Sequence, residues 1–302
     1  MIEVLVLAIL QGIAEFLPIS SSGHLVTVGA WFGELPDEPT LEILLHAGTL
    51  GSILVVYRTR IFELLRRDRR VTALLIVGTI PAAVVGVLIK TQFSDLLRSP
   101  VLAGCMLIVT GLMLIGLGRL RPRRSVAPSD NEGVDNEGVG SEGTVEASAP
   151  EAVSSATSAA TAADASLGVA YPSMSYLAAL AVGCFQAFAI LPGISRSGST
   201  ILGGRLMGLK DEDSVTFSFL LAIPAIGGAT VFAIKDLVES EGASGRYSLA
   251  SLAAGALIAF VVGLLALRWL IDWSRRGRLH WFAWWCIPFG TLVIVYFGLL
   301  AR

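Results

Sequence analysis

Charged side chains are scarce in this sequence of 302 residues. They make up 15% of the chain, against roughly 25% in an average soluble domain, while 54% of the residues are hydrophobic and the mean hydropathy is +0.73. This composition excludes an ordinary soluble enzyme and places most of the chain in lipid. The formal net charge of −2 says little about partners, and no nucleic-acid partner is expected.

Cysteine is also rare, and the familiar motifs of soluble hydrolases are missing. Each of Cys105, Cys184 and Cys286 lies in an apolar stretch without a second Cys or His at metal-ligand spacing, so we interpret them as small buried hydrophobes. The sequence contains no Walker A loop, G-x-S-x-G elbow or zincin motif. The first apolar stretch lacks a basic start and is interrupted by Glu15 and Pro18, which does not fit a cleaved signal peptide.

Long apolar runs are abundant, and each is long enough to cross a hydrocarbon layer of ~30 Å as a helix. We predict six spans, at residues 41–57, 71–89, 100–117, 214–234, 249–271 and 281–300. Arginines cluster in three of the connections, and the positive-inside rule places all three in the cytoplasm. The clusters are Arg58, Arg60, Arg66, Arg67, Arg69 and Arg70; Arg119, Arg121, Arg123 and Arg124; and Arg268, Arg275, Arg276 and Arg278.

A polar tract divides the chain into two halves. Residues 125–170 are rich in Ser, Ala and Gly and carry eight acidic residues but no Lys or Arg. Such a segment cannot bury a core, so residues 121–172 are predicted to form a disordered cytoplasmic linker between membrane units at 1–120 and 173–302. Its tandem DNEGV repeat fails the EF-hand spacing, which favours a solvated tract over a calcium site.

The two halves resemble each other at an offset of 175 residues. Between residues 11 and 23, six of thirteen positions are identical to their counterparts, including Gln11 with Gln186 and Ser20 with Ser195. Each half is one interrupted apolar segment, at 2–32 or 176–209, followed by three spans. An odd number of spans inverts the second unit, so the expected fold is an all-α integral membrane protein with an inverted-topology repeat: six transmembrane helices and two re-entrant hairpins.

The first interrupted segment carries polar residues at its predicted tip. Pro18 should break the helix, and irregular backbone at membrane depth is tolerated where it lines a cavity or is buried in protein. Glu15 is a carboxylate in an apolar hairpin, which by default marks function; the alternative is that it only pairs with a cation such as Arg196. Gln11 shares its helix face. The residues after the break, Ser20, Ser21, Ser22 and His24, stand at the start of the second half-helix, where an anion is favoured.

The second interrupted segment repeats this pattern around an arginine. Pro192 and Gly193 form the break, and Arg196 offers a planar fork that matches phosphate oxygens. Hydroxyls surround it, on Ser195, Ser197, Ser199 and Thr200. We interpret His46 first as a hydrogen-bonded residue of a spanning helix and second as a residue lining the site, and His280 as an interfacial anchor.

These motifs resemble those of the bacterial undecaprenyl-diphosphate phosphatase family, the bacitracin-resistance membrane proteins. The matching stretches are (E/Q)xxxE running into PxSSxGH at residues 11–24 and PGxSRSGxT at 192–200, in a likeness that covers both membrane halves but not the acidic tract. The resemblance implies hydrolysis of undecaprenyl diphosphate at the outer face of the cell membrane, assisted by Mg²⁺ or Ca²⁺. It places the family's catalytic residues on Glu15, Ser21, His24 and Arg196.

This chain departs from the family pattern at one position: some members carry Glu where it has Gln11. Glu15 is then the only carboxylate of the motif, and cation binding is expected to depend more on substrate oxygens. We expect the substrate to contact Gln11, Ser20, Ser22, Ser195, Ser197 and Thr200, and Glu15 to bind the metal.

The predicted mechanism has Ser21 attack the terminal phosphorus while His24 takes its proton; in a variant, cation-bound water attacks directly. Membrane lipids and a second copy of the chain, in a homodimer, are the other expected partners. The rival function is a transporter or lipid-phosphate flippase, because carriers use the same broken helices. A structural scaffold would leave Glu15, His24 and Arg196 unexplained.

Overall fold

The computed structural model describes residues 2–31, 39–92, 97–120, 168–239 and 248–300. Within these ranges the regular secondary structure is helical, apart from an isolated β-bridge between Val169 and Leu209, and turns connect the helices. The predicted acidic linker, with its DNEGV repeat, lies outside the described residues except for its last few positions. An all-α membrane fold, as predicted from the apolar runs, is confirmed.

The first half consists of a broken helix pair followed by longer helices. The pair is α1 (Ile2–Ala14) and α2 (Ser21–Trp31), and the helices that follow are α3 (Pro39–Val56), α4 (Arg58–Arg66), α5 (Arg69–Gln92) and α6 (Pro100–Arg119). The short helix α4 was not predicted. It is rich in arginine and bends away from α3 by 80°.

The second half repeats this order. Its broken pair is α8 (Tyr176–Phe188) and α9 (Arg196–Leu206), and it continues with α10 (Asp211–Glu239), α11 (Leu249–Arg275) and α12 (Ala283–Val295). Short 3₁₀ turns precede α8 (Tyr171–Ser173) and α12 (Leu279–Phe282), and a π-helical turn follows α12 (Tyr296–Leu300).

Among the described residues, five helical segments are long and apolar enough to cross a membrane by themselves. They are α5, α6, α10, α11 and the segment Leu279–Leu300, and they coincide with five of the predicted spans. The sixth predicted span corresponds to α3, which meets the same criterion only together with α4. The chain is therefore a multi-pass membrane protein.

The helices pack through close contacts between the two halves. α6 lies along α12, α3 lies along α11 and also contacts α10, and the first helix of each broken pair packs on the opposite half, α1 on α11 and α8 on α5. Glycines permit these approaches: a Cβ atom at Gly48 would lie 2.3 Å from the Ala256 carbonyl oxygen, and one at Gly183 would lie 2.2 Å from that of Gly78. Small residues at such crossings are typical of membrane helix packing.

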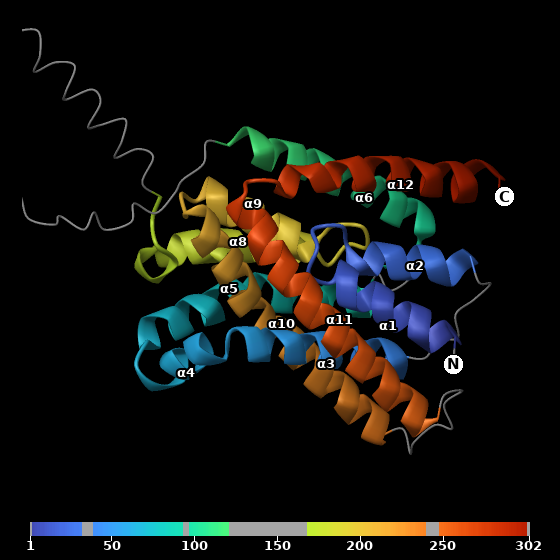
Figure 1. The fold of residues 1–302 in the computed structure, drawn as a ribbon, viewed down its shortest axis with the longest axis horizontal. Helices are drawn as coiled ribbons and strands as arrows, with labels where there is room; N and C mark the ends of the chain where they lie inside the picture. Colours follow the sequence, from blue (N-terminus) through green and yellow to red (C-terminus); the bar gives the residue numbers. More distant parts are fainter. Residues whose placement is uncertain (1, 32–38, 93–96, 121–167, 240–247, 301–302) are drawn as a thin grey trace, which may run out of the picture.

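The two broken pairs form hairpins whose tips meet inside the bundle. In Figure 1 the free ends of α1 and α2 lie at one end of the molecule, those of α8 and α9 lie at the other, and the two connecting loops approach each other near the centre. The helix breaks predicted from Pro18 and Pro192 are thus present, and their meeting point is where the sequence places the candidate site.

The described parts of the three arginine clusters lie at one end of the bundle. Arg60 of α4 donates to the Tyr171 hydroxyl and to Asp68 (3.0 Å), while Arg275 at the end of α11 pairs with Glu212 at the start of α10 (3.4 Å). A cavity lined by Gly118 of α6 and by Gly277, just after α11, joins the end of α6 to the same region. Burial raises the pKa of the Tyr171 phenol, which therefore stays protonated and fixes the chain entering α8.

Candidate functional site

The first hairpin turns at Ser20, which adopts a left-handed conformation (φ +69°). Such a conformation is uncommon outside glycine and usually reflects a functional or structural constraint. The Ser20 Oγ accepts a hydrogen bond from the Gly23 amide at 3.2 Å and so caps α2. Ser21 becomes the first residue of α2, at the helix N-terminus where the sequence predicts an anion site.

The second hairpin also contains a left-handed residue, but it is a glycine that stands two residues before the capping serine. Gly193 has φ +99°, and the Ser195 Oγ caps α9 by accepting from the Gly198 amide at 3.2 Å. Thr110 of α6 fixes this turn from outside, because its hydroxyl donates to the Gly193 carbonyl (2.7 Å) and accepts from the Ser195 amide (3.0 Å). Arg196 is therefore the first residue of α9.

The two tips are in contact. A Cβ atom at Gly23 would lie 2.8 Å from the Cα of Gly193, and one at Gly198 would lie 3.2 Å from the Cβ of Pro18. The N-termini of α2 and α9, each with its partial positive charge, are consequently brought to the same place. No side chain larger than hydrogen fits at Gly23 without moving the other tip.

Glu15 is the centre of the polar contacts at this junction. One carboxylate oxygen accepts from Arg196 Nη2 at 2.6 Å, and the other accepts from the Ser21 hydroxyl at 2.8 Å and from Gln11 Nε2 at 3.1 Å. The Nε2 of His46, on α3, lies 3.7 Å from the same second oxygen. The structure thus brings together the predicted residues Gln11, Glu15, Ser21 and Arg196.

Two polar atoms at this junction remain unused. The Oε1 of Gln11 and the Nη1 of Arg196 are buried and have no hydrogen-bond partner among the described residues. An unsatisfied buried polar group is costly and calls for an explanation, and a bound ligand is one. The side chain of Arg196 is 17% exposed and that of His46 is 25% exposed, so the junction is not sealed.

His46 fulfils both interpretations offered by the sequence. Its Nδ1 donates to the Glu42 carbonyl one turn earlier (2.8 Å), as expected of a polar residue in a spanning helix, while its Nε2 faces Glu15. Sequence reasoning ranked the helix interpretation first and the site-lining interpretation second.

The structure turns His24 away from Ser21. Its Nδ1 lies 2.8 Å from the Ser20 carbonyl oxygen and its Nε2 lies 2.9 Å from the indole nitrogen of Trp285 on α12. Both ring nitrogens are therefore engaged elsewhere, and the role of His24 as the base for Ser21 stays a prediction from the sequence. Neither Trp285 nor Thr110 was singled out by sequence reasoning.

The remaining hydroxyls predicted to contact substrate form hydrogen bonds within the hairpins. The Oγ atoms of Ser20 and Ser22 are 3.3 Å apart, and those of Ser195 and Ser197 are 3.2 Å apart. Thr200 donates to the Arg196 carbonyl at 2.8 Å and is fully buried. Their predicted contacts with substrate stay predictions.

The oxygens around Glu15 suit a hard divalent cation that also binds substrate. Mg²⁺ and Ca²⁺ prefer carboxylate and carbonyl oxygens, and Mg²⁺ in particular is commonly held by one or two carboxylates together with substrate phosphates. Glu15 supplies one carboxylate, and the buried Gln11 Oε1 is an oxygen acceptor still available beside it. The described residues contain no group of three or more His, Cys, Asp or Glu that could hold a metal by themselves.

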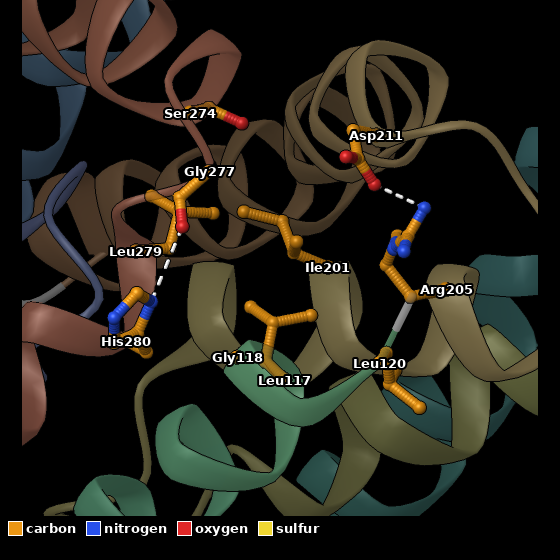
Figure 2. A pocket seen from close by; sticks show the side chains of 10 residues that line it. All are labelled: Leu117, Gly118, Leu120, Ile201, Arg205, Asp211, Ser274, Gly277, Leu279 and His280. Carbon is orange, nitrogen blue, oxygen red and sulfur yellow. Dashed lines mark hydrogen bonds and ion pairs between the residues drawn. The ribbon is translucent and has the colours of Figure 1, made fainter. Parts of the chain in front are cut away.

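A separate cavity of about 70 Å³ lies toward the other end of α9. Figure 2 shows that Arg205 reaches Asp211 there, with which it forms an ion pair, and that His280 points to the Gly277 carbonyl. Nine residues separate Arg205 from Arg196, or about 14 Å along a helix. The cavity lies between the ends of α6, α9 and α11, and its lining includes neither Glu15 nor Arg196, so it is separate from the junction of the hairpin tips.

The fold and the junction define a class: a polytopic membrane protein in which two broken helices present an arginine, a serine and two helix N-termini around one carboxylate. Comparison with known proteins specifies it further. The family model described as bacitracin resistance protein BacA matches residues 4–292. The chain belongs to this family.

Three relatives of similar length carry the same name. A protein named undecaprenyl-diphosphatase from Rhodopirellula baltica is 58% identical over 98% of this chain and 97% of its own. Proteins of the same name from Desulfatibacillum aliphaticivorans and Alkaliphilus metalliredigens are 32% and 33% identical, each over 97% of this chain and 98% of their own. The family resemblance predicted from the two motifs is confirmed.

Proposed function

We propose that this protein hydrolyses undecaprenyl diphosphate to undecaprenyl phosphate and inorganic phosphate in the bacterial cell membrane, and so recycles the lipid carrier of cell-wall synthesis. One observation carries the proposal: Ser21 and Arg196 contact the same carboxylate, Glu15, while the Nη1 of Arg196 has no hydrogen-bond partner among the described residues. A nucleophile and a phosphate-binding fork are thereby held side by side.

Arg196 and the two helix N-termini would bind the diphosphate. The guanidinium of Arg196 can hold two phosphate oxygens at once, and the N-termini of α2 and α9 add partial positive charge. A divalent cation, held by Glu15 and the Gln11 Oε1, would neutralise further negative charge on the phosphates. Phosphoryl transfer depends mainly on such positioning and electrostatic stabilisation.

Ser21 is the nucleophile that the geometry favours. Its oxygen would form a bond to the terminal phosphorus while the bond from that phosphorus to the bridging oxygen breaks, releasing undecaprenyl phosphate. Its proton would pass to the Glu15 carboxylate, which already accepts a hydrogen bond from this hydroxyl at 2.8 Å. Water would then hydrolyse the phosphoserine and release inorganic phosphate.

The arrangement of the hairpins supports an inverted repeat in the membrane. The positive-inside rule assigns the arginine-rich end to the cytoplasm, so the open end of the first hairpin would face outward and admit substrate from that side. Hairpins that meet from opposite sides are also typical of secondary transporters. Lipid-phosphate transport is therefore the second candidate function, with the same anion site.

Phosphate release by the purified protein in detergent tests the proposal. We expect release from C55 diphosphate, a decrease when EDTA is added, and loss of turnover by at least about 10³-fold in Ser21→Ala, because the nucleophile is removed. Ser173→Ala, an exposed serine before α8, is the matched control and should retain turnover. A pure carrier would release no phosphate in detergent.

A substrate labelled at the terminal phosphate separates the two forms of the mechanism. A phosphoserine intermediate would transfer the label to the wild-type protein but not to Ser21→Ala. Direct attack by water would leave both proteins unlabelled while the wild type still turns over.

A further inference from the structure

Trp285 determines which nitrogen of His24 carries the proton. The indole N–H can only donate a hydrogen bond, so the His24 Nε2, 2.9 Å away, must be the acceptor. The proton of the neutral ring is then on Nδ1, which donates to the Ser20 carbonyl at 2.8 Å. The tautomer of His24 follows from the chemistry of its two partners.

Aromatic packing holds the plane of the same ring. The His24 ring stacks on Phe289 with centroids 4.6 Å apart and planes 7° apart, and it lies within 9° of parallel to the Trp285 ring. Trp285 and Phe289 are one turn apart on α12 and stack on each other at 5.6 Å. Trp285 is 52% exposed, whereas His24 is 3% exposed, so the indole reaches the histidine from the periphery of the bundle.

The histidine in turn supports the turn of the first hairpin. The Ser20 carbonyl accepts from both the amide (3.3 Å) and the Nδ1 (2.8 Å) of His24. Ser20 is the one non-glycine residue with positive φ among the residues that the structure describes. A left-handed serine persists where surrounding bonds hold it, and the next residue in the chain is Ser21, whose hydroxyl donates to Glu15.

We propose that Trp285 is a positioning residue for the reaction. It holds His24 as the Nδ1–H tautomer, His24 fixes the left-handed Ser20, and this turn aims the Ser21 hydroxyl at Glu15. The inference rests on the proposed function, and it assigns His24 a role through Nδ1, with Nε2 committed to the indole. The family motif ends at His24, and its partner on α12 lies 261 residues further along the chain.

Three single substitutions and one double substitution test the assignment. Trp285→Phe keeps an aromatic ring but removes the N–H donor, and we expect kcat to fall about tenfold with KM within twofold. In His24→Asn the side-chain amide nitrogen replaces Nδ1 as a donor to Ser20, so kcat should stay within about tenfold of wild type. In His24→Gln the amide nitrogen lies where Nε2 was, and kcat should fall at least 10²-fold.

The double variant distinguishes a positioning role of Trp285 from a purely structural one, because only the positioning role depends on His24. With Asn at position 24 no Nε2 remains to be held, so adding Trp285→Phe should change kcat by less than twofold. The control is Trp284→Phe, which changes an 81% exposed neighbour on the same helix and should leave kcat unchanged both in the wild type and in His24→Asn. Additive losses from the two substitutions, or equal loss in His24→Asn and His24→Gln, would overturn the proposal.

A spectroscopic measurement is independent of turnover. The chain contains three histidines, so ¹⁵N-histidine labelling gives few side-chain signals, and the His24 signals are those missing from His24→Asn. We expect a protonated Nδ1 and a hydrogen-bonded Nε2 in the wild type, and in Trp285→Phe a shift of the Nε2 signal toward that of a free nitrogen. An unchanged Nε2 signal would refute the contact with Trp285, whereas absence of phosphate release from the wild type would refute only the proposed function.

Discussion

Glu15 and Arg196 are 181 residues apart in the sequence, and in the structure their carboxylate and guanidinium meet at 2.6 Å. This ion pair joins the tips of the two hairpins, and so it joins the two halves of the chain. Pairing with Arg196 was the structural alternative that the sequence offered for Glu15. The pair is present, but Gln11, Ser21 and His46 gather around the same carboxylate, which a purely structural ion pair does not require.

Replacing Arg196 with lysine separates charge from geometry. Lysine keeps the positive charge but loses the planar fork, and the fork both orients the phosphate and stabilises the transition state. We expect Arg196→Lys to lose on the order of 10² to 10³ in kcat, comparable with removal of one preorganised transition-state donor. The measurement is turnover at saturating C55 diphosphate.

The matched control is Arg276→Lys, which changes an exposed arginine just after α11 and should leave turnover within about twofold. Near-normal turnover by Arg196→Lys would mean that only the charge matters, and it would reduce Arg196 to a partner of Glu15.

Gln11→Glu should make the site more dependent on a divalent cation. The substitution places a second carboxylate one turn from Glu15, where the Gln11 Nε2 now lies 3.1 Å from it. Two adjacent buried carboxylates repel each other, and a bound cation compensates for that repulsion. We therefore expect lower thermal stability than wild type in EDTA and a larger recovery when Mg²⁺ or Ca²⁺ is added.

Thermal unfolding in detergent, with and without each cation, checks this prediction. Gln186→Glu is the control, because Gln186 is the counterpart of Gln11 in the second half, and Ile190 stands there in place of Glu15. An equal response of both variants to cation would argue against a cation site at Gln11 and Glu15.

The two ends of α11 should lie on opposite sides of the membrane. Ser248 precedes this helix and Arg276 follows it, and both are exposed. In a background without native cysteines, Ser248→Cys should react with an impermeant maleimide on intact cells, and Arg276→Cys should react only after permeabilisation. The reverse labelling pattern would mean that the orientation in the membrane is opposite to the predicted one and that the first hairpin opens to the cytoplasm.

Local features of the sequence account for most of the fold and for part of the site. Apolar length defines the spanning helices, and prolines followed by Ser and Gly define the breaks, because each effect acts within a few residues. The repeat then predicts that the two tips meet. The contact of Glu15 with Arg196 follows from that meeting, which is why the sequence could offer the two residues as a pair.

The site contacts that the sequence did not predict depend on residues far apart in the chain. His46 on α3, Thr110 on α6 and Trp285 on α12 reach the tips from helices whose packing no local pattern specifies. The orientation of His24 could not be predicted for the same reason. Its spacing from Ser21 puts both on neighbouring positions of α2, but the direction of its ring is set by Trp285 and Phe289, far along the chain.

Gly193→Ala should strongly destabilise the junction of the two hairpins. Gly193 has φ +99°, which alanine adopts only with strain, and its new Cβ would lie 2.2 Å from the Ala103 carbonyl oxygen. Strain and overpacking together predict a loss of roughly 2–4 kcal/mol in the free energy of unfolding. The Thr110 bond to the Gly193 carbonyl would be disturbed as well, so turnover should fall together with stability.

Gly116→Ala provides the matched control within a single helix. Gly116 lies in α6, and a Cβ there meets nothing within 4 Å of the described structure, so alanine should be neutral or stabilise the protein by about 0.5–1 kcal/mol. The measurement is the temperature at which half of the purified protein remains monodisperse in detergent. Both substitutions add one methyl group. Equal changes in this temperature would therefore contradict the prediction that alanine at position 193 is strained and clashes with α6.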